Sequence, residues 1–146
     1  MDIRFCDYQT IDYPSWRALW LDYTGSAAAH LTEELHQHTF ARVRDDQDPL
    51  HGVIAWTDRP VGFAHYYFHP SSYSVQNACT LEDLYVCATA RRRGVARALI
   101  DWVAARAAAA QAPVLNWKTR ETNTSAHALY DSLALRTGFV AYQMKL

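Results

Sequence analysis

Three consecutive arginines and a glycine stand where an apolar, strand-like run gives way to a helical pattern. Arg91, Arg92 and Arg93 directly precede Gly94, and apolar residues recur at helical spacing after it. A helix N-terminus presents unpaired backbone N–H groups and a partial positive charge, which together favour an anion. Glycine lets the backbone approach a ligand closely, and arginines add charge that reaches phosphate oxygens. The stretch is therefore suited to hold a pyrophosphate.

Two further observations bear on the interpretation of this stretch as a pyrophosphate site. Val95 and Ala96 are small and keep the approach to the glycine clear. The phosphate-binding patterns GxxxxGK(S/T) and GxGxxG do not occur in the chain. An arginine triplet alone is more often a solvated loop before an ordinary helix. The spacing by itself leaves that alternative open.

The elements of the first half predict two helices and an antiparallel meander. Asp12 is placed to cap a helix that begins at Tyr13, and Asp48-Pro49 cannot continue a helix. The turn Asp58-Arg59-Pro60 separates two β-rich runs and predicts a hairpin. The expected elements are a strand at 2–6, helices at 13–20 and after Thr32, and strands at 50–57, 61–69 and 78–86.

The second half predicts strand, helix, strand, helix and strand. The helix after Gly94 has an apolar stripe that packs on a sheet, and Pro113 ends it. A strand at 113–118 then lies parallel to the strand before the arginines, because a crossover helix joins them. Thr124 or Ser125 caps a last helix that Gly138 stops, and the run FVAYQMKL closes the chain as a strand.

Composition narrows the class of protein. The chain has 146 residues, which suits a single domain spanning 1–146. Fourteen basic and fifteen acidic residues leave a formal charge of -1, so we expect no nucleic-acid partner. We expect a cytoplasmic protein with no membrane partner, since neither a signal peptide nor a bilayer-spanning run occurs. Three cysteines without CxxC spacing favour buried thiols over disulfides or zinc.

Two motifs in order resemble one family. Arg91-x-x-Gly94-x-Ala96, preceded by LEDLYV, resembles the acyl-CoA-binding motif (Q/R)-x-x-G-x-(G/A) of the GNAT N-acetyltransferases. The strand VLNWKT, the loop RETN and the helix SAHALYDSLA are similar to the second half of the GNAT core, so the resemblance covers about 78–146. The first half matches by element order alone. One departure is Cys87-Ala88, where members often have an acidic residue and a proline.

The resemblance implies a fold and a cosubstrate. The fold is the GNAT acyl-CoA N-acyltransferase fold, α/β, with a central mixed sheet of six to seven strands flanked by about four helices. The cosubstrate is acetyl-CoA, without a metal, and the parallel strands splay apart beside a bulge. Val86 N–H would serve as the oxyanion donor. The cofactor-binding residues implied are Leu84, Tyr85, Val86, Arg91, Arg92, Arg93, Gly94, Val95, Ala96, Asn123, Ser125 and Tyr130.

A carboxylate must take a proton from the amine, because amines are mostly protonated near neutral pH. Glu82 and Asp83 are adjacent on a strand, so we expect them on opposite faces, with only one facing the substrate. LEDLYV is similar to LEDFFV of spermidine/spermine acetyltransferases, whose acidic pair serves amine binding and deprotonation. We favour Glu82 as the base. Asp83, a water chain or a structural role for the pair stay open.

Tyr130 is the implied general acid. It stands seven residues after Asn123, as the family's tyrosine stands after its pantetheine-contacting asparagine. A phenol on the apolar face of the last helix can protonate the departing CoA thiolate, although a core tyrosine would look the same. His65 and His69 share a strand face and either line the cleft or bind metal. No carboxylate or cysteine completes a metal set, so we expect none.

The acceptor is predicted only by class. The sequence resembles the GNAT branch of polyamine, diamine and D-amino-acid acetyltransferases, whose members commonly form dimers. We expect acetyl transfer to a primary amine of a small metabolite by direct attack in a ternary complex, in a homodimer that the run at 139–146 helps to build. Alternatives are a protein lysine or N-terminal acceptor, or a non-catalytic acyl-CoA sensor. Residues 1–75 hold no acceptor motif.

Overall fold

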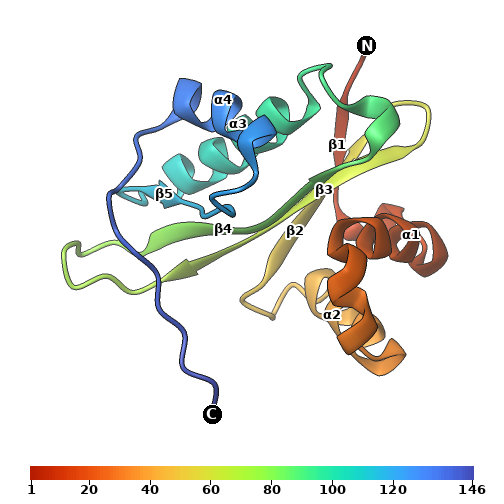
Figure 1. Cartoon of the computed structure of the whole chain (residues 1–146), viewed down its shortest axis with the longest axis horizontal. Helices are drawn as coiled ribbons and strands as arrows, with labels where there is room; N and C mark the ends of the chain where they lie inside the picture. Colours follow the sequence, from red (N-terminus) through yellow and green to blue (C-terminus); the bar gives the residue numbers. More distant parts are fainter.

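A five-stranded mixed sheet forms the centre of the computed structural model (Figure 1). The structure describes the backbone of the whole chain and the side chains of residues 1–26 and 29–146. The strands lie in chain order, β1 to β5; the first four pair antiparallel, and β5 joins β4 in parallel. Their bounds are β1 (Arg4–Cys6), β2 (His51–Trp56), β3 (Pro60–His69), β4 (Ala78–Val86) and β5 (Leu115–Asn116).

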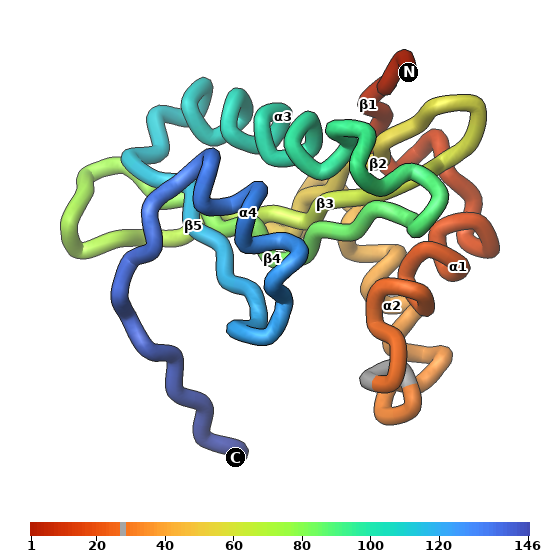
Figure 2. Tube along the Cα trace, turned by 45° about the horizontal axis from the view of Figure 1, so that its top comes forward, coloured from red at the N-terminus to blue at the C-terminus, as the bar shows by residue number. Residues whose placement is uncertain are grey.

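Helices cover both faces of this sheet, α1 and α2 on one and α3 and α4 on the other (Figures 1 and 2). The Asp12 carboxylate accepts from Ser15 N–H at 2.8 Å and caps α1, and Thr32 caps α2 in the same way. The bounds are α1 (Tyr13–Thr24), α2 (Glu33–Arg44), α3 (Val95–Ala109) and α4 (Thr124–Leu133), with 3-10 turns η1 (Tyr8–Thr10), η2 (Gly25–His30) and η3 (Ala88–Ala90).

The sheet separates two apolar cores, because successive strand side chains face opposite sides. Along β2, Val53 and Ala55 pack under α3, whereas Ile54 packs under α1 and α2. The α3 core contains Leu99, which is fully buried, and the α1–α2 core is mostly aromatic around Trp16. Both cores close against β3 and β4, so these two strands are held rigidly from both sides.

The predicted α/β class, the meander and the parallel neighbour strand are confirmed. The sheet has five strands, whereas six to seven were expected, because residues 139–146, predicted as the last strand, are unpaired. The predicted strand at 113–118 is present only as the two residues of β5. α4 ends at Leu133, well before Gly138, where the extended Ala134 breaks the helix. α3 ends at Ala109, ahead of the left-handed Gln111, and not at Pro113 as predicted. The N-cap of α4 is Asn123, not Thr124 or Ser125, and its side chain makes no capping hydrogen bond. No helix of the described chain is long and apolar enough to cross a membrane.

Two irregularities in β4 shape the region that follows. β4 pairs with β5 only through Cys79 and Thr80, so its remaining residues, Leu81–Val86, continue past the end of β5. The β3–β4 register shifts by one residue, from His65 opposite Asp83 to the next β3 residue opposite Leu81. Glu82 is therefore the extra residue of a β-bulge. The predicted bulge is present, and the pairing of β4 with β5 ends on the side of the bulge where the splay was predicted.

Candidate active site

The free edge of β4 presents backbone groups beyond the end of β5. Cys87 N–H donates to the Val61 carbonyl at 2.8 Å, and the antiparallel register continues from that pair. Hydrogen bonds alternate along such a ladder, so Tyr85 turns its backbone toward β3, whereas Leu84 and Val86 turn theirs toward the splay. Of the three residues expected to pair with a pantetheine arm, the register brings Leu84 and Val86 to this edge. It leaves the Tyr85 backbone in the sheet.

Gly94 is the N-cap of α3 and has the left-handed conformation, with φ 81°. A Cβ built there would meet no atom within 4 Å, so the space beside the helix N-terminus is free. Arg92 is left-handed as well, with φ 58°, which is strained for an arginine. The side chains of Arg92 and Arg93 are exposed, while Val95 is buried in the α3 core. This geometry fits an anion held by the first N–H groups of α3.

Arg91 has a second contact that the motif did not predict. Its Nε donates to the Val86 carbonyl at 3.0 Å, and its guanidinium lies 5.9 Å from the centre of the Tyr85 ring. The arginine therefore joins the turn to the end of β4. Because Arg91 hydrogen-bonds to the Val86 carbonyl, the Val86 N–H is the backbone group of this residue that remains free at the edge of β4.

Both carboxylates lie on the α1–α2 face, which corrects the expectation of opposite faces. Asp83 contacts His65, and Glu82 lines a hollow of about 310 Å³ with Tyr67, Arg42 and other residues. His65 and Tyr67 are two positions apart on β3 and so share a face. The alternation fails between the two acidic residues because the extra residue of the bulge is Glu82 itself.

Asp83 and Glu82 differ sharply in their surroundings. The Asp83 side chain is 18% exposed; its Oδ1 accepts from Tyr23 OH at 2.9 Å and its Oδ2 lies 2.8 Å from Nδ1 of the buried His65. Glu82 is exposed, and no described side chain hydrogen-bonds to it. Burial, followed by the charge of Asp83, raises the pKa of Tyr23 well above its ordinary value, and Glu82 and Tyr130 are close enough to add to that shift.

Sequence reasoning missed Tyr23 and left His65 as a residue that either lines the cleft or binds metal. Tyr23 lies sixty positions from Asp83 in the chain, and no local pattern marks it. For His65 a signal existed, because the predicted β3–β4 meander makes it a cross-strand neighbour of the acidic pair. The hydrogen bond itself depends on the bulge, which the sequence does not reveal.

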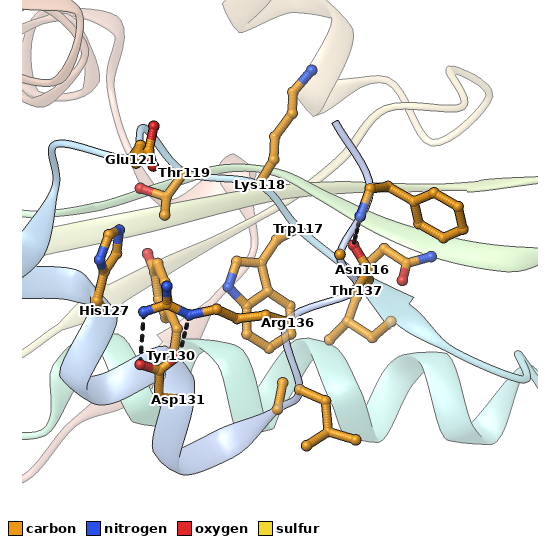
Figure 3. Close-up of a pocket in the computed structure, with 15 residues that line it drawn as sticks. Asn116, Trp117, Lys118, Thr119, Glu121, His127, Tyr130, Asp131, Arg136 and Thr137 are labelled. Carbon is orange, nitrogen blue, oxygen red and sulfur yellow. Dashed lines mark hydrogen bonds and ion pairs between the residues drawn. The ribbon is translucent and has the colours of Figure 1, made fainter. Parts of the chain in front are cut away.

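Tyr130 projects from α4 against Trp117, with ring centroids 5.6 Å apart and the rings edge to face (Figure 3). The residue is half-buried, and burial raises the pKa of its hydroxyl, which therefore stays protonated at neutral pH. Asn123 donates to Thr119 Oγ1 at 3.0 Å and accepts from Ser125 Oγ at 3.2 Å. The three predicted residues after β5 thus lie on α4 or at its start.

A pocket of about 520 Å³ lies between β5, α4 and the segment 134–139 (Figure 3). Of the predicted site residues it includes Tyr130 alone, and an ion pair between Arg136 and Asp131 crosses it. It is bounded by the segment that the sheet leaves unpaired and does not include the β4 edge or the arginine turn. Among the described residues no three His, Cys, Asp or Glu side chains are grouped to hold a metal ion.

Comparisons with known proteins agree on one family. Residues 11–134 match the Acetyltransferase (GNAT) family. D-amino-acid N-acetyltransferase HPA3 of Saccharomyces cerevisiae (strain ATCC 204508 / S288c) is 36% identical over 135 residues, which cover 90% of this chain and 84% of that protein. The match includes the first half, where the sequence alone offered only element order.

Solved structures show the same fold. AAC(6')-Iy in complex with the bisubstrate analog CoA-S-monomethyl-acetylneamine aligns with a TM-score of 0.81 at 22% identity, over 99% of this chain and 97% of that one. Ribosomal-protein-alanine N-acetyltransferase from Brucella melitensis biovar Abortus 2308 aligns with a TM-score of 0.78 at 20% identity, over 99% and 98%. The family match and the yeast relative establish the class of enzyme: the chain belongs to the GNAT family and is an acetyl-CoA-dependent N-acetyltransferase.

Proposed function

We propose that the protein transfers the acetyl group of acetyl-CoA to a primary amine of a small metabolite, such as a polyamine, a diamine or an amino acid. The observation that carries this proposal is the pair Glu82 and Asp83 on one sheet face, directly before the free edge at Leu84 and Val86. Two carboxylates suit an ammonium acceptor. The name of the yeast relative and the acetylneamine portion of the aligned bisubstrate analog agree with a small amine.

The residues present fit acetyl-CoA. The N–H groups that follow Gly94 would hold its pyrophosphate, with Arg92 and Arg93 at the rim, since the glycine leaves that space clear. The free groups of Leu84 and Val86 would pair with the pantetheine arm, and Asn123 and Ser125 would meet it from α4. Acetyl-CoA supplies the activated acetyl group.

The residues then divide the proton work of a direct attack. Glu82, exposed and unbonded, takes one proton from the ammonium, directly or through water. As the nitrogen bonds to the carbonyl carbon, Val86 N–H donates to the developing oxyanion. Tyr130 donates its proton to the sulfur as the C–S bond breaks, and it regains one from the acylated nitrogen. The products are an N-acetyl amine, free CoA and one proton.

Thiol release from acetyl-CoA tests this function. The panel contains polyamines, diamines, D- and L-amino acids, an aminoglycoside and a lysine peptide. We expect release with one class of small amine. Turnover of the peptide alone would overturn the small-metabolite acceptor. Binding of acetyl-CoA without release by any amine of the panel would overturn the proposed small-amine acceptor.

We also infer a homodimer that uses the C-terminal segment. Val140, Tyr142, Met144 and Leu146 alternate along an extended chain and are 74% to 110% exposed. A row of apolar side chains beside unpaired backbone groups suits addition to a sheet edge of a second copy. The expected cytoplasmic location remains a prediction.

A further inference from the structure

A chain of polar side chains runs through the aromatic core beneath α1 and ends at Asp83. Trp16 Nε1 donates to Tyr8 OH at 3.1 Å, Tyr8 OH lies 2.5 Å from His65 Nε2, and His65 Nδ1 lies 2.8 Å from Asp83 Oδ2. Trp16, Tyr8 and His65 are at most 1% exposed. Asp83, at the end of the chain, is the member that reaches the surface.

Counting protons fixes the direction of every bond in this chain. An indole N–H only donates, so the Tyr8 oxygen accepts from Trp16. Burial raises the pKa of the Tyr8 hydroxyl well above its ordinary value, so this hydroxyl keeps its proton. His65 Nε2 is the acceptor it meets, which leaves the imidazole proton on Nδ1 to donate to Asp83. With the proton on Nε2 instead, the Tyr8 hydroxyl would have no acceptor for its proton, and Nδ1 would have no proton to donate to Asp83.

Packing holds the chain in place. Gly52 pairs with His65 across β2 and β3, and a Cβ on Gly52 would overlap the Tyr8 ring, 2.3 Å from its Cε2. The missing side chain thus lets Tyr8 reach the histidine. The Phe63 ring stacks on His65, with centroids 4.9 Å apart and planes at 30°. The imidazole therefore cannot turn without displacing its neighbours.

We propose that His65 and Tyr8 are positioning residues for the acceptor amine, which hold Asp83 oriented to receive its ammonium group. This role rests on the function proposed above. Tyr23 and His65 each bond one Asp83 oxygen and leave the remaining lone pairs for a cation. Because an imidazole with one proton is neutral, it orients the carboxylate and leaves its negative charge intact. An arginine or a lysine in the same place would cancel that charge. Asp83 would bind the amine while the unbonded Glu82 takes the proton.

Two amide variants at one position separate orientation from mere packing. In His65→Asn the amide nitrogen can replace Nδ1 and donate to Asp83, whereas in His65→Gln the amide reaches the place of Nε2. We expect His65→Gln to lower kcat/KM for the amine by about 100-fold, mostly through a higher KM, since misplaced binding groups have effects of this size. His65→Asn should retain most of the activity, and both should bind acetyl-CoA like the parent.

Equal losses in both variants, or a parallel loss of acetyl-CoA affinity, would overturn the positioning role. A measurement on the unmodified protein stands beside the variants in case they fail to fold. Nitrogen NMR of the His65 ring should show its proton on Nδ1, and a proton on Nε2 would overturn the proposal. If the unmodified protein acetylates no amine, the proposed function fails; if it does but the two variants behave alike, only the positioning role fails.

Discussion

At the residue scale, the reaction is divided among groups whose surroundings differ. Tyr130 is half-buried and keeps its proton, Glu82 is exposed and unbonded, and Asp83 is fixed by two donors. Gly94 holds a left-handed turn that few other residues adopt without strain. Each of these differences predicts a separate effect on catalysis or on ligand binding.

Replacing the Tyr130 hydroxyl should slow the chemical step. We expect Tyr130→Phe to lower kcat by about 100-fold or more and to change the Kd of acetyl-CoA far less, because the lost hydroxyl acts chiefly as the general acid. Since burial raises the pKa of Tyr130, the acid form persists up to and beyond pH 10, so it should add no basic limb below that pH. Tyr73→Phe, at an exposed position outside the C-terminal segment, is the control. Near-normal turnover in Tyr130→Phe would refute the acid role.

Two glycines with similar positive φ angles test the pyrophosphate site. Gly94 and Gly138 have φ 81° and 78°, and neither has an atom within 4 Å of a built Cβ. Alanine should strain both by about 1–2 kcal/mol. Only Gly94→Ala should weaken CoA binding, on the order of tenfold for each 1.4 kcal/mol lost. Calorimetry with CoA measures both variants, and equal affinities would remove the site from the α3 N-terminus.

At the element scale, β4 is the strand on which the site is built. Its bulge brings two adjacent carboxylates to one face, its free edge turns Leu84 and Val86 toward the splay, and Arg91 holds its end. The polar chain beneath α1 reaches β4 through β3. The position of Asp83 therefore depends on residues of η1 and β2 that never meet a substrate.

Gly52→Ala tests that dependence from a distance. The added methyl group must displace the Tyr8 ring, so we expect a loss of amine kcat/KM similar to that of Tyr8→Phe. Both variants should retain acetyl-CoA affinity. In the double variant the two effects should not add, because both act on one hydrogen bond. Additive losses in this double-mutant cycle would show that Gly52 acts on the site by another route.

Most of the helices and strands around the site could be predicted from the sequence, and the predictions that failed share one physical cause. The strand, turn and helix around Gly94 were predicted because their signals are local: a period of two, three arginines, a glycine and a period of 3.6. The faces of Glu82 and Asp83 were not, because a bulge depends on pairing with β3. Tyr8, Tyr23 and His65 reach their partners across 57, 60 and 18 positions, so only the folded chain shows them together.

At the scale of the whole molecule, the sheet of the described chain ends in a very short edge strand, and the C-terminal segment is unpaired. β5 pairs over two residues, and the C-terminal segment runs away from the sheet with its apolar side chains exposed (Figure 1). The run FVAYQMKL has the alternating pattern of a strand, but no strand of the described chain pairs with it. A second copy would provide one.

Removing residues 139–146 should therefore change the assembly and leave the fold. We expect the full chain to sediment as a dimer and the shortened chain as a monomer of retained secondary structure, because the segment contributes to neither core. Sedimentation velocity with circular dichroism measures both. A monomeric full chain, or a shortened chain that still dimerises, would contradict the C-terminal interface.

The central claim is that the face of β4 with two carboxylates receives a small amine beside bound acetyl-CoA. The most direct test is thiol release from acetyl-CoA across the amine panel, run side by side with the protein and with Asp83→Asn. We predict release with one class of small amine, and a higher KM for that amine in Asp83→Asn with unchanged acetyl-CoA affinity. Release that is indifferent to Asp83, or acetyl-CoA binding without release to any amine, would contradict the claim.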